Sequence, residues 1–111
     1  MDAFARTEIV DQHRQNGELY YEFLRKERLS VGLYVLEAGA TDPQSPHTED
    51  EIYYIVSGAG IIEVDGEARA VGAGAVICVG ARVAHRFHTI TEDLSVIVVF
   101  APPRRSMAVQ C

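Results

Sequence analysis

The sequence predicts an all-β domain folded as a sandwich or a barrel. Short segments rich in Val, Ile, Tyr and Phe recur along the 111 residues, with glycine- or proline-containing turns between them. Hydrophobic residues make up 48% of the chain, which is an ordinary globular proportion. No segment carries a convincing helical periodicity. Many short, closely spaced strands in a small chain are typical of a closed or two-layered β architecture.

The expected strands follow one another closely. They cover residues 19–24, 29–36, 51–57, 59–64, 67–71, 75–79, 83–89 and 94–100. Asp65-Gly66 fits a two-residue hairpin turn, because such turns need positive φ. We expect one domain over residues 1–111, consisting of an N-terminal segment (1–17), a barrel core (about 18–101) and a loose tail (104–111).

The charge balance argues against several partners. The net charge is −6, whereas nucleic-acid binding needs clustered cations. We interpret the basic runs 25–28 and Arg104-Arg105 as solvated turns or tail. The N-terminus lacks the apolar stretch of a signal peptide, and no segment reaches the roughly 18 apolar residues of a membrane span. With Cys78 read as a small core side chain, these features predict a cytoplasmic protein that binds neither nucleic acid nor membrane.

The strand expected over 51–57 is largely apolar on both faces. One face includes Tyr53 and Ile55, and the other includes Ile52 and Tyr54. A barrel interior covers only one of them. The second face is covered either by another copy of the chain, which predicts a homodimer, or by a neighbouring segment of the same chain, such as residues 1–17.

Two histidines and a glutamate carry the chemistry. His47 and Glu51 flank the start of a strand, and His85 lies near the start of a later one. Imidazole and carboxylate together suit Fe(II), Mn(II), Zn(II), Ni(II) or Co(II). Four residues of straight strand span roughly 13 Å, whereas metal ligands lie about 2–2.2 Å from the ion. A shared ion therefore requires the chain to bend over Thr48-Glu49-Asp50; otherwise these are surface residues and a hydrogen-bonded strand histidine.

The segment from Gly39 to Gly58 resembles the first motif of the cupin family. That motif contains an opening glycine, two histidines separated by one residue, a glutamate and a closing glycine. His47 falls on the second histidine, Glu51 on the glutamate and Gly58 on the closing glycine. Ser45 stands where the first histidine is usual.

A second stretch resembles the second cupin motif. Gly74 and His85 match its opening glycine and its histidine. Gly80 replaces the usual proline, Arg82 replaces a glycine, and Thr89 stands where asparagine is frequent. The spacing is retained although these letters depart from the pattern.

The resemblance spans roughly residues 39–100 and implies a small single-domain cupin. Its fold would be a double-stranded β-helix, or jelly-roll barrel. It implies one divalent metal ion (Fe, Mn, Zn or Ni) held by His47, Glu51 and His85. Such a 2-His-1-carboxylate set also occurs in non-haem Fe(II) oxygenases, where it leaves positions open.

Other residues are weaker candidates for the same site. Ser45 could hold a metal-bound water, Glu49 could replace the lost ligand if the bend aims it inward, and His88 lies three residues after His85. Tyr53 and Phe87 share strand faces with the proposed ligands, so each either lines the pocket or belongs to the core.

Two functions follow. The first is a metal-dependent enzyme of dioxygenase, isomerase or lyase type that acts on a small bidentate molecule. The second is a non-catalytic binding or sensory barrel with a degenerate metal site, which the departures from both motifs favour. A purely structural barrel is a third reading.

Overall fold

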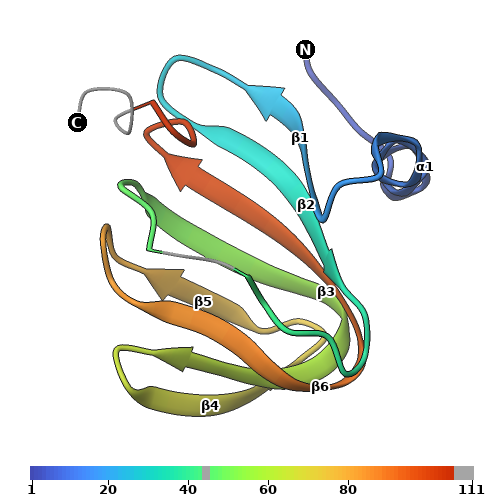
Figure 1. Cartoon of the computed structure of the whole chain (residues 1–111). Coiled ribbons are helices and arrows are strands. Elements are labelled where there is room, and N and C mark those ends of the chain that lie inside the picture. Colours follow the sequence, from blue (N-terminus) through green and yellow to red (C-terminus); the bar gives the residue numbers. More distant parts are fainter. Residues whose placement is uncertain (44–45, 107–111) are drawn as a thin grey trace.

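Antiparallel strands wrapped into a barrel form most of the protein (Figure 1). The computed structural model describes residues 1–43 and 46–106. Within these residues the elements are α1 (Arg6–Asn16), β1 (Tyr20–Arg25), β2 (Ser30–Leu36), β3 (Asp50–Val64), β4 (Glu67–Gly72), β5 (Val76–Val79) and β6 (His85–Ala101). The hydrogen-bonded order is β1-β2-β6-β3-β4, with β5 also paired to β3. The predicted all-β jelly-roll barrel is confirmed.

Two strands are longer than predicted. β3 joins the two strands expected over 51–57 and 59–64, and β6 joins the last two, so the described residues hold six strands in place of eight. The register of β3 against β6 shifts three times between Ile55 and Ile61. Such shifts bend a strand. As a result the first half of β3 pairs with β5 and the second half with β4, and one strand serves both sides of the barrel.

Gly58 lies at the bend of β3. Its φ is +98°, and a Cβ placed there would lie 2.1 Å from the main-chain oxygen of Asp93 on β6. Only a glycine allows this close approach in this backbone conformation. The glycine of the first motif therefore has a structural reason.

The barrel core is built from the inward faces of β3 and β6. Along the first half of β3, Glu51, Tyr53 and Ile55 are buried, whereas Ile52 and Tyr54 are exposed. This is the alternation that the sequence predicts. It places the carboxylate of Glu51 inside the barrel, among apolar side chains.

Helix α1 was not predicted, and the expectation that the N-terminal segment has no helix is wrong. Gly17 ends the helix with φ +76°, and its N–H donates to the carbonyl of His13. The ring of His13 is also hydrogen-bonded to the carbonyl of Leu19. None of the helix residues is fully buried, so the apolar periodicity that signals a helix is weak.

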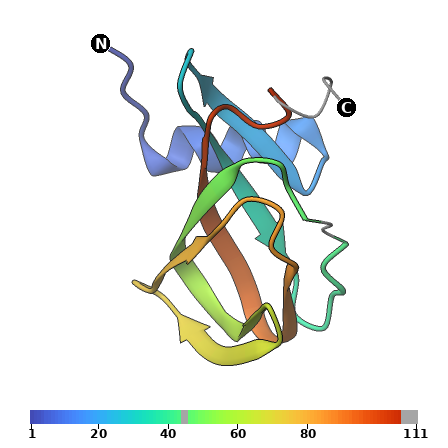
Figure 2. The same ribbon diagram turned by 90° about the vertical axis from the view of Figure 1, so that its left-hand side faces the viewer.

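The N-terminal segment packs on the outer side of β1 and β2 (Figures 1 and 2). Phe4 contacts Phe23 of β1 with ring centroids 5.0 Å apart. The outer face of β3 and β5 remains uncovered, with Ile52 43%, Tyr54 46% and Val76 65% exposed. The alternative in which residues 1–17 cover Ile52 and Tyr54 is therefore wrong.

The interpretation of Cys78 as a core residue is also wrong. The side chain is exposed, because β5 alternates and points its neighbour Val79 into the core instead. Among the described residues no helix is long and apolar enough to cross a membrane.

Candidate metal centre

His47, Glu51 and His85 come together at one end of the barrel interior. His47 precedes β3, Glu51 is its second residue, and His85 begins β6. The chain bends at Thr48 and Glu49, as the spacing argument requires. One ligand atom from each of the three residues lies within 4.8 Å of the others. The two residues on strands are buried, and His47 is half-buried.

The contact between His85 and Glu51 defines the inner part of the centre. The Nε2 atom of His85 lies 2.7 Å from Oε1 of Glu51. The Nδ1 atom of His85 lies 2.8 Å from the carbonyl oxygen of Val83. A carbonyl can only accept, so Nδ1 carries the proton and Nε2 of the neutral ring offers a lone pair. At 2.7 Å the two atoms are at hydrogen-bond distance, so a proton joins them when no metal is bound, and a metal ion would take the place of that proton.

Apart from the 2.7 Å contact with each other, the buried oxygens of Glu51 and Nε2 of His85 have no hydrogen-bond partner among the described residues. A buried carboxylate without such partners is costly unless a cation compensates it. The donor set therefore fits a divalent metal: two imidazoles and one carboxylate, converging on a common point in a buried environment.

Burial and charge act differently on the two histidines. Burial alone would lower the pKa of His85, but the adjacent Glu51 carboxylate and the Val83 carbonyl outweigh it and raise the pKa above the usual 6.5. Burial prevails at His47 and lowers its pKa. The lowered pKa favours the neutral form of His47, which is the form that binds a metal, and the raised pKa favours a protonated His85 when no metal is bound.

The loop before β6 holds His47 in place. The N–H of Arg82 donates to the carbonyl of His47 at 2.6 Å, and the N–H of Ala81 donates to the Asp50 carboxylate at 2.8 Å. Arg82 replaces a motif glycine and keeps the positive φ of that position, at +64°. The departure from the second motif therefore leaves the turn intact.

Tyr53 and Phe87, the predicted pocket residues, belong to the core. Both side chains are fully buried, and their ring centroids are 5.1 Å apart. Tyr53 also packs beside His85, with centroids 6.0 Å apart. They support the centre from inside, and neither lines the cavity described below.

The weaker candidates lie elsewhere. Glu49 is buried, but its carboxylate accepts the N–H of Arg105 at 3.0 Å and the hydroxyl of Thr48. His88 turns away toward Glu63, with its Nε2 atom 3.8 Å from the carboxylate. Ser45 lies outside the described residues.

A cavity of about 630 Å³ opens beside His47. Its wall also includes Tyr20, Tyr34, Phe100 and Arg104. Of the three residues His47, Glu51 and His85, only His47 lines this cavity.

Two residues of this region carried no recognised signal in the sequence. Asp42, buried in the loop after β2, accepts the hydroxyl of Tyr34 at 2.6 Å and the N–H of Phe87 at 2.9 Å. Arg104, interpreted as part of a solvated tail, lies with its guanidinium over the ring of Tyr20. Residues 104–106 form a turn whose N–H groups are hydrogen-bonded, and 107–111 lie outside the described residues.

The comparisons with known proteins agree with the motifs and the fold. A family model for the cupin domain matches residues 32–100, from β2 to the end of β6. An uncharacterized protein of Streptomyces coelicolor, SCO3923, is 50% identical over 103 residues, which cover 93% of this chain and 98% of that protein.

Solved structures show the same architecture. KdgF from Halomonas sp. has a TM-score of 0.71 and 26% identity, over 79% of this chain and 81% of that one. TT1209 from Thermus thermophilus has a TM-score of 0.74 and 21% identity, over 93% and 99%. An RmlC-like cupin from Shewanella frigidimarina has a TM-score of 0.67 and 21% identity, over 75% and 74%. The last two likenesses concern the fold alone. The match of the cupin family model over residues 32–100 establishes that this chain belongs to the cupin family.

Proposed function

We propose that this cupin holds one divalent metal ion (Fe, Mn, Zn or Ni) through His47, Glu51 and His85, and that it is an enzyme acting on a small molecule. The observation that carries the proposal is the convergence of the three ligand atoms within 4.8 Å of one another. Ligands about 2.0–2.2 Å from one ion lie at most just over ~4 Å apart, so small side-chain adjustments complete the site.

Each residue has a distinct task in the proposed site. Glu51 neutralises part of the metal charge and fixes its position inside the barrel. His85 is oriented by the carbonyl of Val83, an outer-shell contact that sets its tautomer. His47 faces the cavity and completes the triad on the side where substrate enters.

Three protein ligands leave coordination positions free for a small bidentate molecule such as a hydroxy acid, a diketone or a catechol-like compound. A bound ion would supply Lewis-acid chemistry, or oxygen chemistry if it is iron. Dioxygenase, isomerase and lyase reactions all fit this arrangement.

A non-catalytic binding barrel is the second candidate. It is favoured by Ser45 in place of a histidine, and by Gly80 and Arg82 in the second motif. In that case a proton on His85 compensates Glu51, and the cavity binds an organic ligand without metal.

The two candidates are separated by metal content. Untagged protein purified without chelator is analysed by mass spectrometry beside His47→Ala, His85→Ala and the control His88→Ala. The enzyme proposal expects near-stoichiometric metal in the wild type and in His88→Ala, and its loss from the other two variants. Equal metal in all four proteins, or none in the wild type, contradicts it and leaves the binding barrel.

A further inference from the structure

The guanidinium of Arg104 lies at the wall of the cavity. Its carbon atom lies 4.7 Å from the ring centroid of Tyr20 and 6.0 Å from that of Phe100. A guanidinium stacked on a ring keeps its N–H donors in its own plane, directed outward. Among the described residues none of these donors forms a hydrogen bond or an ion pair.

The neighbouring carboxylates are engaged with other groups. Glu22 forms an ion pair with Arg25 at 3.2 Å. Glu49 accepts the N–H of Arg105 and the hydroxyl of Thr48. Burial lowers the pKa of Arg104, but an arginine remains charged at any physiological pH. Its positive charge is therefore available to a ligand.

The position of Arg104 is fixed by main-chain contacts. Its N–H donates to the hydroxyl of Ser30 at 2.9 Å, and its carbonyl accepts from the guanidinium of Arg25 at 2.9 Å. Ser30 is fully buried at the start of β2. The chain around Arg104 is thus tied to the barrel, which a simple solvated tail would not require.

The ring of Tyr20, over which the Arg104 guanidinium lies, packs against the sheet. The ring of Tyr20 lies over Gly32 of β2, where a Cβ would come within 2.2 Å of the ring. Gly32 therefore leaves the space that the Tyr20 ring occupies beneath Arg104. The ring is partly buried, and its hydroxyl has no hydrogen-bond partner among the described residues.

We propose that Arg104 binds a carboxylate of the substrate, so that the substrate is a small organic acid whose other end reaches the metal beside His47. Both residues line the same cavity. Arg105 also lines this cavity, and the carboxylates of Glu18 and Glu49 in its wall repel a doubly charged phosphate more strongly than a singly charged carboxylate. The proposal rests on the proposed function, because the metal binds the other end of the acid.

The test uses 2-hydroxy dicarboxylic acids of four to six carbons, each beside its distal monoamide, in calorimetric titrations of metal-loaded protein. The acid is expected to bind roughly tenfold or more tightly than its amide, since a hydrogen bond to a charged group contributes about 1.5–3 kcal/mol. In Arg104→Met this preference should disappear. In Arg69→Gln, which removes an exposed guanidinium on β4 outside the cavity, it should remain.

The controls separate this inference from the proposed function. Metal content and melting temperature are measured for every variant, and the titrations are repeated after chelator treatment. If the wild type contains no metal as purified and its acid binding still depends on Arg104, the metal proposal is refuted and the role of Arg104 is retained. Equal binding of acids and amides by the wild type overturns the inference. It is also overturned if the preference persists in folded Arg104→Met, or if inorganic phosphate binds more tightly than the acids.

Discussion

Asp42 links the loop after β2 to the strand that carries His85. Its two carboxylate oxygens accept the hydroxyl of Tyr34 and the N–H of Phe87, at 2.6 and 2.9 Å. Burial, followed by the hydrogen bond to Asp42, raises the pKa of Tyr34 above its usual value, so the phenol stays protonated and donates. Phe87 lies two residues after His85, and Asp42 therefore helps to fix the start of β6.

Removal of the Tyr34 hydroxyl should lower the stability of the protein. Tyr34→Phe leaves the aromatic packing but takes a hydrogen bond from a buried carboxylate, which is expected to cost about 1–3 kcal/mol of the unfolding free energy. Denaturant unfolding measures the difference. Tyr21→Phe is the matched control, since the hydroxyl of Tyr21 has no partner in the described part of the chain, and it should change little. Equal losses in both variants would contradict this role of Asp42.

At the residue scale the sequence revealed part of the site. The spacing of the two motifs was enough to group His47, Glu51 and His85, because the motif positions are set by strands that pair in register. Asp42 and Arg104 act through contacts with residues far away in the sequence, and no local sequence pattern predicts such contacts. Their environment is set only when the barrel closes.

At the scale of elements, the bent antiparallel pairing of β3 with β6 shapes the barrel. Gly58 allows the two backbones to touch, since a Cβ at this position would lie only 2.1 Å from the Asp93 carbonyl oxygen. The bend that follows from it lets one half of β3 carry Glu51 toward the interior while the other half pairs with β4.

Gly58→Ala should therefore be severely destabilising. Positive φ and the clash with β6 each cost about 1–3 kcal/mol, so a loss of roughly 3 kcal/mol or more is expected. Gly72→Ala is the control, because its Cβ would meet nothing nearer than 3.8 Å and no positive φ is required there. Thermal unfolding should show Gly72→Ala within about 1 kcal/mol of the wild type. A mild effect of Gly58→Ala would contradict this, because it would show that β3 and β6 can move apart at this position without a large loss of stability.

Element prediction succeeded where side chains alternate and failed where they do not. The strands follow from alternation and from turn residues such as Asp65-Gly66, which link β3 to β4 as expected. The register shifts of β3 could not be predicted, since they depend on its pairing with β6. Helix α1 was missed because few of its residues are apolar, although Gly17 and the basic residues of its last turn are typical of a helix end.

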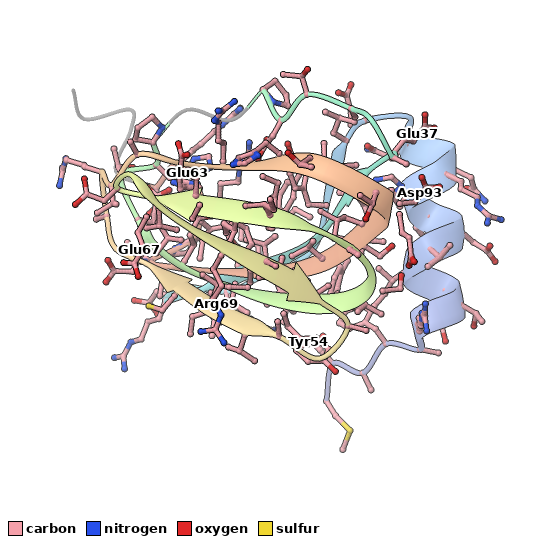
Figure 3. All side chains as sticks on the ribbon, turned by 90° about the horizontal axis from the view of Figure 1, so that it is seen from below. Glu37, Tyr54, Glu63, Glu67, Arg69 and Asp93 are labelled. Carbon is pink, nitrogen blue, oxygen red and sulfur yellow. The ribbon has the colours of Figure 1, made fainter. Side chains whose placement is uncertain are left out.

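At the scale of the molecule, one outer surface remains to be explained. α1 covers β1 and β2, while Ile52, Tyr54 and Val76 stay exposed on β3 and β5; Tyr54 is labelled in Figure 3. Of the two coverings that the sequence allowed, the N-terminal segment is excluded for these residues. We propose that a second copy of the chain covers this face, because its exposed side chains are apolar and uncharged, which suits association between two chains of net charge −6.

We therefore expect a homodimer through this face. Sedimentation should give twice the chain mass of 12.2 kDa for the wild type. Tyr54→Glu should shift the protein toward the monomer, because two carboxylates would be brought together at the interface. Arg14→Glu, which adds negative charge on the exposed side of α1 away from β3 and β5, should leave the dimer unchanged. A wild-type protein that sediments as a monomer at all concentrations contradicts the expectation.

The central claim is that His47, Glu51 and His85 bind one metal ion together. Crystals grown from chelator-free protein, with data collected on both sides of the absorption edge of the bound metal, test it most directly. The account predicts a single anomalous peak about 2.0–2.3 Å from Nε2 of His85, an oxygen of Glu51 and a ring nitrogen of His47. The absence of a peak at this position, or a peak that one or more of these residues does not ligate, would contradict it.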